Sequence, residues 1–178
     1  KVGKTRYLVH KCNNMKSFKV LFVNSSFDAE RVQNDIQDIC QDAKPVYCHD
    51  KVRYLNCSIS FVNTSNISDI ESLFQQYDII AINEGQFFDD LENIRPYLSS
   101  SKNFIIASLD SDKFGNDFGY IKNLLKDCDS IKKFTTNCEM CHQKIATFSR
   151  CVSTSSDSII DVGGGDKYLA VCRDCFNL

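Results

Sequence analysis

Four cysteines lie in two closely spaced pairs near the end of the sequence. Two residues separate Cys138 from Cys141, and two residues separate Cys172 from Cys175. This spacing lets both thiolates of a tight turn reach one ion, and two such turns supply the four sulfurs of a tetrahedral metal site. Because four protein ligands leave no open coordination position, the pattern predicts a structural Zn²⁺ and not a catalytic one.

Other interpretations of these cysteines stay open at this point. The pairs are compatible with two unrelated groups of buried thiols, and one Cys-x-x-Cys pair is compatible with a redox role. His142 adjoins Cys141 and is an alternative ligand, although an exposed histidine is the simpler interpretation. The chain has 10 cysteines in all, and their uneven spacing favours one metal site plus free thiols over a disulfide framework. We therefore expect a reducing, cytoplasmic location.

A second candidate site opens the sequence. Gly3, Lys4 and Thr5 match the end of a P-loop, in which backbone amides cradle phosphates, the lysine reaches the β and γ oxygens and the hydroxyl binds Mg²⁺. The first glycine of that motif would precede Lys1, so we expect the natural chain to begin further upstream. Three residues alone are weak evidence. A predicted helix over 6–15 and a predicted strand over 18–23 supply the context that a P-loop requires.

An acidic residue follows a buried strand in the middle of the chain. Asn83 and Glu84 come directly after the apolar segment 79–82. The carboxyl end of a parallel strand is where an α/β fold carries its chemistry, and Glu84 is the best candidate for a general base. A lone glutamate there is also compatible with a solvated surface acid. Asn83 occupies the point at which a P-loop kinase normally has an aspartate for Mg²⁺, and an amide brings no charge to the metal.

The surrounding elements predict an α/β fold. Strands over 18–23, 79–82 and 104–109 are apolar on both faces and alternate with predicted helices over 68–74, 89–98 and 118–125. This alternation is typical of a parallel sheet with helices on both faces. After about residue 135, cysteine pairs, a Ser/Thr-rich stretch and a glycine run replace this rhythm. We therefore predict an α/β domain over 1–134, lacking the first strand and the start of the P-loop, and a small zinc-binding subdomain over 135–178.

Composition narrows the classes of function. The 178 residues are 43% hydrophobic and 25% charged, with a formal net charge of −2. These values are ordinary for a soluble globular protein, and no basic stripe suggests nucleic-acid binding. No apolar run approaches the roughly 18 residues that a membrane span needs. The sequence therefore indicates a small-molecule partner and neither a nucleic acid nor a membrane.

Several segments together resemble one family. The segment INEGQFFDDL, beginning at Ile82, is similar to the DEGQFFPDI segment of type II, zinc-containing thymidine kinases. The tail VGGGDKYLAVCRDC resembles that family's IGGADKY followed by a second cysteine pair, and LDSDKFGNDFG resembles its LDGTFQRKPFG. The resemblance spans residues 1–176 in the right order, and its most specific parts are EGQFF and GGGDKY with the cysteines.

The resemblance implies a fold and a reaction. The fold would be a P-loop NTPase-like parallel sheet with a zinc ribbon and a "lasso" loop that closes on the nucleoside. The reaction would transfer the γ-phosphate of ATP to the 5′-hydroxyl of thymidine, or of deoxyuridine, and give thymidine monophosphate in nucleotide salvage. ATP, Mg²⁺ and a structural Zn²⁺ would be the cofactors, and the assembly would be a homotetramer.

The same resemblance implies a role for each matching residue. Glu84 would accept the proton of the 5′-hydroxyl. The residues around the ATP phosphates and Mg²⁺ would be Gly3, Lys4, Thr5, Asp28, Arg31, Asn83, Gly85 and Gln86. The nucleoside would contact Lys113, Phe114, Phe118, Tyr168 and the lasso residues Ile159, Ile160, Asp161, Val162 and Gly163. The four paired cysteines would bind zinc and anchor the two ends of the lasso.

Departures from the family pattern support two alternatives. Asn83 replaces the family's aspartate, two residues instead of one separate Asp28 from Arg31, and Lys113 aligns with the aromatic residue of the base pocket. A weakly active or inactive relative that keeps the fold as a binding or regulatory subunit would tolerate all three changes. A zinc-ribbon interaction module attached to an α/β domain is a further alternative that does not depend on the resemblance.

Overall fold

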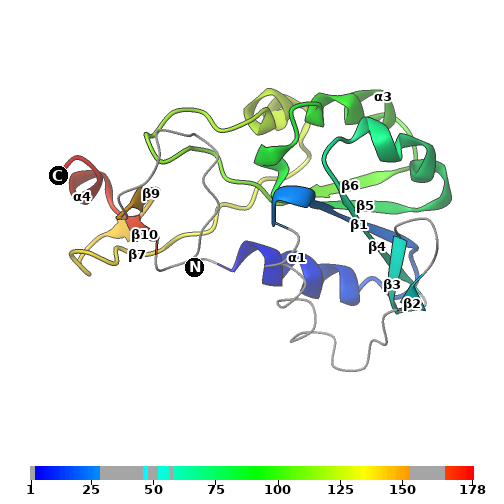
Figure 1. Cartoon of the computed structure of the whole chain (residues 1–178), viewed down its shortest axis with the longest axis horizontal. Coiled ribbons are helices and arrows are strands. Elements are labelled where there is room, and N and C mark those ends of the chain that lie inside the picture. Colours follow the sequence, from blue (N-terminus) through cyan, green and yellow to red (C-terminus); the bar gives the residue numbers. More distant parts are fainter. Residues whose placement is uncertain (1–2, 29–45, 48–51, 57, 153–166) are drawn as a thin grey trace.

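The computed structural model describes residues 3–28, 46–47, 52–56, 58–152 and 167–178, with only the backbone of residues 28, 46–47 and 52–56. Its main feature is a six-stranded sheet with the strand order β2-β3-β4-β1-β5-β6 (Figure 1). The strands are β1 (Val20–Ser25), β2 (Val46–Tyr47), β3 (Val52–Asn56), β4 (Ile59–Thr64), β5 (Ile79–Asn83) and β6 (Asn103–Ile106).

The four strands at the centre run parallel. β1 pairs with β4 on one side and with β5 on the other, and β5 pairs with β6. Every residue of β1 and of β5 is buried, as expected for strands covered on both faces. This confirms the predicted parallel sheet. The antiparallel pairing of β2 with β3 and of β3 with β4 extends the sheet on one side and was not predicted.

Helices cover both faces of the sheet, as predicted. On one face, helix α1 (Lys4–Asn13) buries Leu8, Val9 and Cys12 against β1 and β5. On the other face, Phe74, Ile94 and Leu124 belong to one apolar cluster with side chains of the same strands. The elements of this second face are η2 (Ser68–Gln76), η4 (Leu91–Ile94), α3 (Arg95–Leu98) and η5 (Ile121–Asp127). Figure 1 shows α1 below the sheet and α3 above it.

Two of the predicted helices are shorter and tighter than expected. The segment predicted as one helix over 89–98 is a 3₁₀ turn, η4, followed by α3, with Pro96 in the first turn of α3. Proline has no N–H to donate and is tolerated only in a first turn, which explains the break. The segment predicted over 118–125 begins later, at Ile121, because Gly119 has a left-handed φ of +62° that a helix cannot contain.

The C-terminal part contains only short elements. Strands β7 (Thr136–Asn137) and β8 (Ile145–Ala146) form one pair, β9 (Phe148–Cys151) and β10 (Tyr168–Val171) form another, and helix α4 (Arg173–Phe176) follows. These elements gather at one end of the molecule, away from the large sheet (Figure 1). Within the described residues, no helix has both the length and the apolar character needed to span a bilayer.

Candidate functional site

Helix α1 begins at the predicted phosphate motif. Gly3 precedes it in a left-handed conformation, with φ 72° and ψ 27°, and its carbonyl accepts the first helical hydrogen bond from the N–H of Tyr7. No atom lies within 4 Å of the position that a Cβ of Gly3 would take, so the left-handed turn and not crowding favours glycine there. The first N–H groups of a helix have no partner within it and form a natural anion site. The N-terminus of α1 is therefore suited to binding a phosphate group.

The structure brings the end of β5 to this helix. The hydroxyl of Thr5 donates a hydrogen bond of 3.1 Å to Oδ1 of Asn83, and both side chains are buried. Glu84 follows Asn83 with a left-handed φ of 52°, which is rare for a residue other than glycine, and its side chain is only 6% exposed. This excludes the interpretation of Glu84 as a solvated surface acid. Thr5 therefore meets Asn83 at the carboxyl edge of the sheet, and Glu84 is the next residue in the chain.

Gln86 holds the carboxylate of Glu84. Its Nε2 donates a 2.7 Å hydrogen bond to Oε2 of Glu84. Its Oε1 accepts a 2.9 Å hydrogen bond from the backbone N–H of Leu109, just beyond β6. Because that N–H can only donate, it fixes which end of the Gln86 amide faces Glu84. The resemblance had implied that Gln86 lies near the phosphates, whereas its observed contact is with the candidate base.

Two glycines let the chain pack tightly around Gln86. Gly85, at the start of the 3₁₀ turn η3 (Gly85–Phe87), donates its N–H to the carbonyl of Ala107, and a Cβ there would lie 2.8 Å from Cγ2 of Ile106. At Gly119, a Cβ would lie 2.5 Å from the backbone oxygen of Gln86. Real Cβ atoms do not come this close to other heavy atoms, so a side chain at either position would force the neighbouring atoms to move, and at Gly119 that neighbour is backbone. The segment after β6 and the backbone at Gly119 therefore enclose the Glu84–Gln86 turn.

An aromatic group lies beside this turn. Phe87 meets Phe118 edge to face with ring centroids 5.7 Å apart, and Phe27 lies 5.9 Å from Phe87 on the other side. Phe27 belongs to η1 (Ser26–Asp28) and is about half exposed. Phe118 was predicted to contact the nucleoside, whereas the sequence analysis did not select Phe87 or Phe27. The FF pair after EGQ was a signal for Phe87, but nothing in the sequence joined Phe27 to it.

The predicted base-pocket residues Lys113 and Phe114 lie on a tight loop. The carboxylate of Asp112 accepts the N–H groups of Phe114 and Asn116 at 2.8 and 2.9 Å and fixes this turn. Nζ of Lys113 lies 5.2 Å from the centroid of the Phe114 ring, which is 53% exposed. At Gly115, which has a φ of +84°, a Cβ would lie 3.3 Å from the Phe176 ring. This loop therefore rests on the cysteine end of the molecule.

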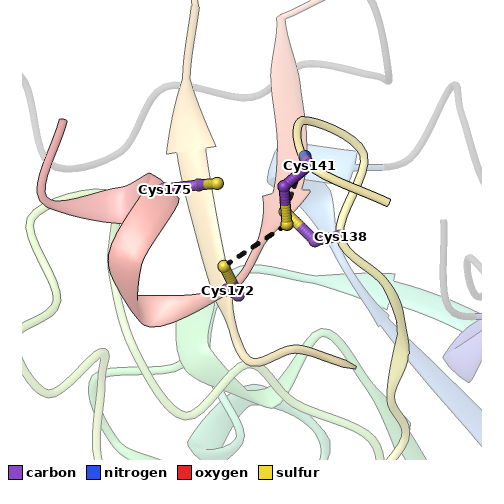
Figure 2. Close-up of side chains that lie close together, drawn as sticks. All are labelled: Cys138, Cys141, Cys172 and Cys175. Carbon is purple, nitrogen blue, oxygen red and sulfur yellow. Dashed lines mark hydrogen bonds between the residues drawn. The ribbon is translucent and has the colours of Figure 1, made fainter. Parts of the chain in front are cut away.

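The four paired cysteines converge, as predicted. Their sulfur atoms all lie within 4.8 Å of one another, and Sγ of Cys141 lies 3.9 Å from Sγ of Cys172. Figure 2 shows the side chains of both pairs turned towards one another. In a tetrahedral Zn²⁺ site with bonds of about 2.3 Å, neighbouring sulfurs are roughly 3.8 Å apart, so this donor set fits zinc. His142 is exposed and not part of the cluster, and among the described cysteines there is no disulfide.

The thiols of this cluster have unequal acidity when no metal is considered. Burial raises the pKa of Cys138, but hydrogen bonds from nearby backbone N–H groups outweigh it and lower the pKa to about 6. For Cys175, burial and hydrogen bonds with the other thiols raise the pKa to about 12. Cys138 is therefore the more acidic of these two thiols, and a bound Zn²⁺ would displace the thiol protons of the cluster.

Of the remaining predicted residues, Lys4 and Tyr168 lie within the part of the chain that the structure describes. Lys4 is the first residue of α1, and Tyr168 is the first residue of β10, where its partner in the strand pair is Cys151. The Asp28 side chain, Arg31 and the lasso residues Ile159, Ile160, Asp161, Val162 and Gly163 lie outside the described residues. Their predicted roles stay predictions.

Comparison with known proteins agrees with this geometry. A family model described as thymidine kinase matches residues 1–176. A protein of Dictyostelium discoideum named thymidine kinase 1 is 34% identical over 98% of this chain and 73% of its own length. Thymidine kinases of Amsacta moorei entomopoxvirus and fowlpox virus are each 31% identical over 98% of this chain, and over 92% and 90% of their own lengths. The chain belongs to the thymidine kinase family.

Proposed function

We propose that the protein transfers the γ-phosphate of Mg-ATP to the 5′-hydroxyl of thymidine, or of deoxyuridine, and so makes thymidine monophosphate for nucleotide salvage. The observation that carries this proposal is the meeting of two elements. Thr5, at the start of the phosphate-binding helix, donates a hydrogen bond to Asn83, and the buried carboxylate of Glu84 comes next in the chain. A phosphate site and a general base are thereby combined at one strand end, as phosphoryl transfer requires.

The residues of α1 would bind the triphosphate. The free N–H groups at the start of the helix suit its oxygens, and Lys4 adds a positive charge beside them. Thr5 and Asn83 offer two side-chain oxygens 3.1 Å apart. Neighbouring ligands of an octahedral Mg²⁺ with bonds of about 2.1 Å lie roughly 3.0 Å apart, so this pair of oxygens fits the ion. Bound Mg²⁺ would neutralise charge on the transferring phosphate.

Glu84 would accept the proton of the attacking 5′-hydroxyl. Its orientation depends on Gln86, whose amide is itself fixed by Leu109. A carboxylate held in this way needs little reorganisation when the nucleoside hydroxyl arrives. Burial keeps bulk water away from Glu84, which favours transfer to the nucleoside over hydrolysis of ATP.

The nucleoside would bind beside the aromatic group formed by Phe87 and Phe118. A flat base packs well against ring faces and edges, and these rings lie next to the Glu84–Gln86 turn. Residues 159–163 and Tyr168 would close over the base, with structural Zn²⁺ anchoring that loop. A homotetramer, which follows from the resemblance alone, and a cytoplasmic location, which follows from the cysteine pattern, are parts of the same proposal.

A second function is favoured by one observation, the neutral side chain of Asn83 where the family has aspartate. With no carboxylate beside the metal, charge neutralisation during transfer is weaker. The alternative is therefore a protein that binds nucleotide and acts as a subunit or regulator with little turnover.

The test is direct measurement of thymidine monophosphate formed by the full-length protein with Mg-ATP. Glu84→Gln, which keeps the shape of the side chain and removes the base, should lower kcat by about 10²- to 10⁴-fold. Glu92→Gln is the matched control, because Glu92 of η4 forms a partly exposed ion pair with Arg95 of α3, and the loss of this pair should have little effect.

Either result separates the two functions. Turnover that Glu84→Gln removes and Glu92→Gln leaves intact supports the kinase and the assignment of the base. A folded, zinc-containing protein that binds ATP without phosphorylating thymidine supports the binding subunit and contradicts the kinase.

A further inference from the structure

Three asparagines stand side by side at the carboxyl ends of the three neighbouring parallel strands β4, β1 and β5. In the sheet register, Asn24 pairs with Asn63 on one side and with Asn83 on the other. Nδ2 of Asn83 donates a 2.9 Å hydrogen bond to Oδ1 of Asn24, and Nδ2 of Asn24 donates one of 3.2 Å to Oδ1 of Asn63. Asn24 and Asn83 are fully buried. We call these three residues the asparagine ladder.

The ladder has a direction, and it ends at Thr5. The amide nitrogens of Asn83 and Asn24 donate towards Asn63, and the amide oxygens of all three residues accept from the Thr5 side. The single hydroxyl hydrogen of Thr5 is used on Asn83. The Thr5 oxygen can therefore present only its lone pairs to any other group. A hydroxyl binds a cation through its lone pairs, so this orientation suits cation binding.

A backbone carbonyl fixes this direction. Nδ2 of Asn24 also donates a 3.0 Å hydrogen bond to the carbonyl oxygen of Ser25. A carbonyl cannot become a donor, so rotating the Asn24 amide by half a turn would bring two oxygens together. Oδ1 of Asn24 must therefore face Asn83, and position 83 must supply a donor. An aspartate at 83 would put a buried carboxylate oxygen about 2.9 Å from Oδ1 of Asn24.

We infer that Asn24 is a positioning residue for the cation of the nucleotide site, acting through Asn83 on the hydroxyl of Thr5. This inference rests on the proposed function in one respect, that the start of α1 binds the phosphates of Mg-ATP. It gives the neutral residue at position 83 a physical reason. Oδ1 of Asn24 needs a hydrogen-bond donor, and the amide of Asn83 supplies it. Changing Asn83 alone to the family's aspartate therefore breaks the ladder instead of restoring a metal ligand.

The first experiment measures binding of a fluorescent, non-hydrolysable ATP analogue to the full-length protein, in Mg²⁺ and in EDTA. The ratio of the two dissociation constants is the Mg²⁺ gain. Asn24→Leu, an apolar residue of similar shape, should reduce this gain by about tenfold, the value of one or two lost hydrogen bonds, and leave affinity in EDTA nearly unchanged. Asn24→Ala must give the same loss if the leucine variant does not fold.

Asn24→Asp is the conservative variant. Its carboxylate still accepts from Asn83, so the Mg²⁺ gain should persist. It no longer donates to Ser25 or Asn63, so stability should fall, by roughly 5 °C in Tm. Loss of the Mg²⁺ gain in Asn24→Leu but not in Asn24→Asp, although both variants lose stability, is a pattern that a merely structural asparagine would not produce. Equal loss of affinity with and without Mg²⁺ in Asn24→Leu, or loss of the gain in Asn24→Asp, overturns the inference.

A thermal double-mutant cycle tests the ladder without nucleotide. Asn83→Asp should lower Tm by roughly 5 °C in the native protein and by clearly less in an Asn24→Leu background, where no facing oxygen remains. Burial of the new carboxylate is common to both backgrounds and cancels in the difference. Strict additivity would contradict the ladder.

The two proposals fail separately. A protein with the expected pattern of Mg²⁺ gains and no thymidine turnover keeps this inference and contradicts the proposed kinase. A protein that phosphorylates thymidine with no Mg²⁺ gain in analogue binding does the reverse.

Discussion

At the carboxyl edge of the central sheet, strands of five and six residues position Asn24, Asn63 and Asn83. At the other end, Cys138 and Cys141 lie between two strands of two residues each, and Cys172 and Cys175 follow a strand of four residues. The buried apolar clusters differ in the same way. Twelve buried side chains form the larger cluster of the sheet, but the buried cluster at the cysteine end consists of Val171 and three of the paired cysteines among the residues that the structure describes.

This difference shows which force determines each geometry. The sheet edge is set by hydrophobic burial and strand register, so its polar network needs no ion to form. The described residues of the cysteine end bury little apolar surface, so we expect its shape to depend on a bound metal ion. The loop at Gly115, which rests on Phe176, joins the two regions.

The largest effect is expected from removing one metal ligand. Cys172→Ser should abolish zinc binding and unfold the C-terminal part, because binding of a structural Zn²⁺ supplies about 10–16 kcal/mol in comparable small sites. Zinc content and protease cleavage after about residue 135 would measure this, while the far-ultraviolet circular dichroism of the sheet should largely persist. Cys128→Ser is the control, because Cys128 lies outside the cluster. Loss of the whole fold in Cys172→Ser would show that the two regions are not independent.

A smaller effect is expected at the sheet edge from Gln86→Glu. One oxygen of the new carboxylate can still accept a hydrogen bond from the N–H of Leu109. The other oxygen takes the place of Nε2 of Gln86, which in the native protein donates to Oε2 of Glu84 at 2.7 Å. Two carboxyl groups at this distance share a proton, so kcat should fall by about 10- to 100-fold and the acidic limb of the pH–rate profile should move to higher pH. Zinc content should not change.

Gln76→Glu makes the same chemical change at an exposed position on η2 and should leave the pH profile where it is. If Gln86→Glu lowers kcat without moving the acidic limb, then Gln86 supports the fold and does not position the base.

The smallest effect is expected where the two regions meet. Phe176 stacks on Phe148 with centroids 4.7 Å apart and supports the loop at Gly115. Phe176→Ala should raise KM for thymidine about three- to tenfold with kcat almost unchanged, because the base loop loses support while the site at Glu84 does not. Steady-state kinetics on zinc-loaded protein measures this, with Phe18→Ala, at a half-exposed site, as the control. An unchanged KM would mean that the loop at Gly115 is held by its contacts with the sheet domain alone and does not need Phe176.

Much of the candidate site could be predicted because its signals are local. Spacing alone identified the cysteine pairs, and the apolar segment 79–82 correctly indicated a buried strand that delivers Asn83 and Glu84 to one edge. The strand that contains Asn63, β4, was missed, although it pairs with β1 along its whole length. Its alternating apolar and polar residues (ISFVNT) carry a weaker signal than the continuous apolar runs of β1 and β5.

The sequence by itself determined the chemistry that this protein can perform: four thiolates spaced for one metal ion, a glycine-led helix for phosphate and a carboxylate after a buried strand. Residue type and local spacing carry these features. Only the tertiary structure decided how they are held. The asparagine ladder joins residues that are 39 and 59 positions apart in the sequence. The hydrogen bond from Gln86 to Glu84 depends on Leu109, which lies 23 positions after Gln86. Such contacts follow from strand order and register, which packing of the whole core selects and no single segment encodes.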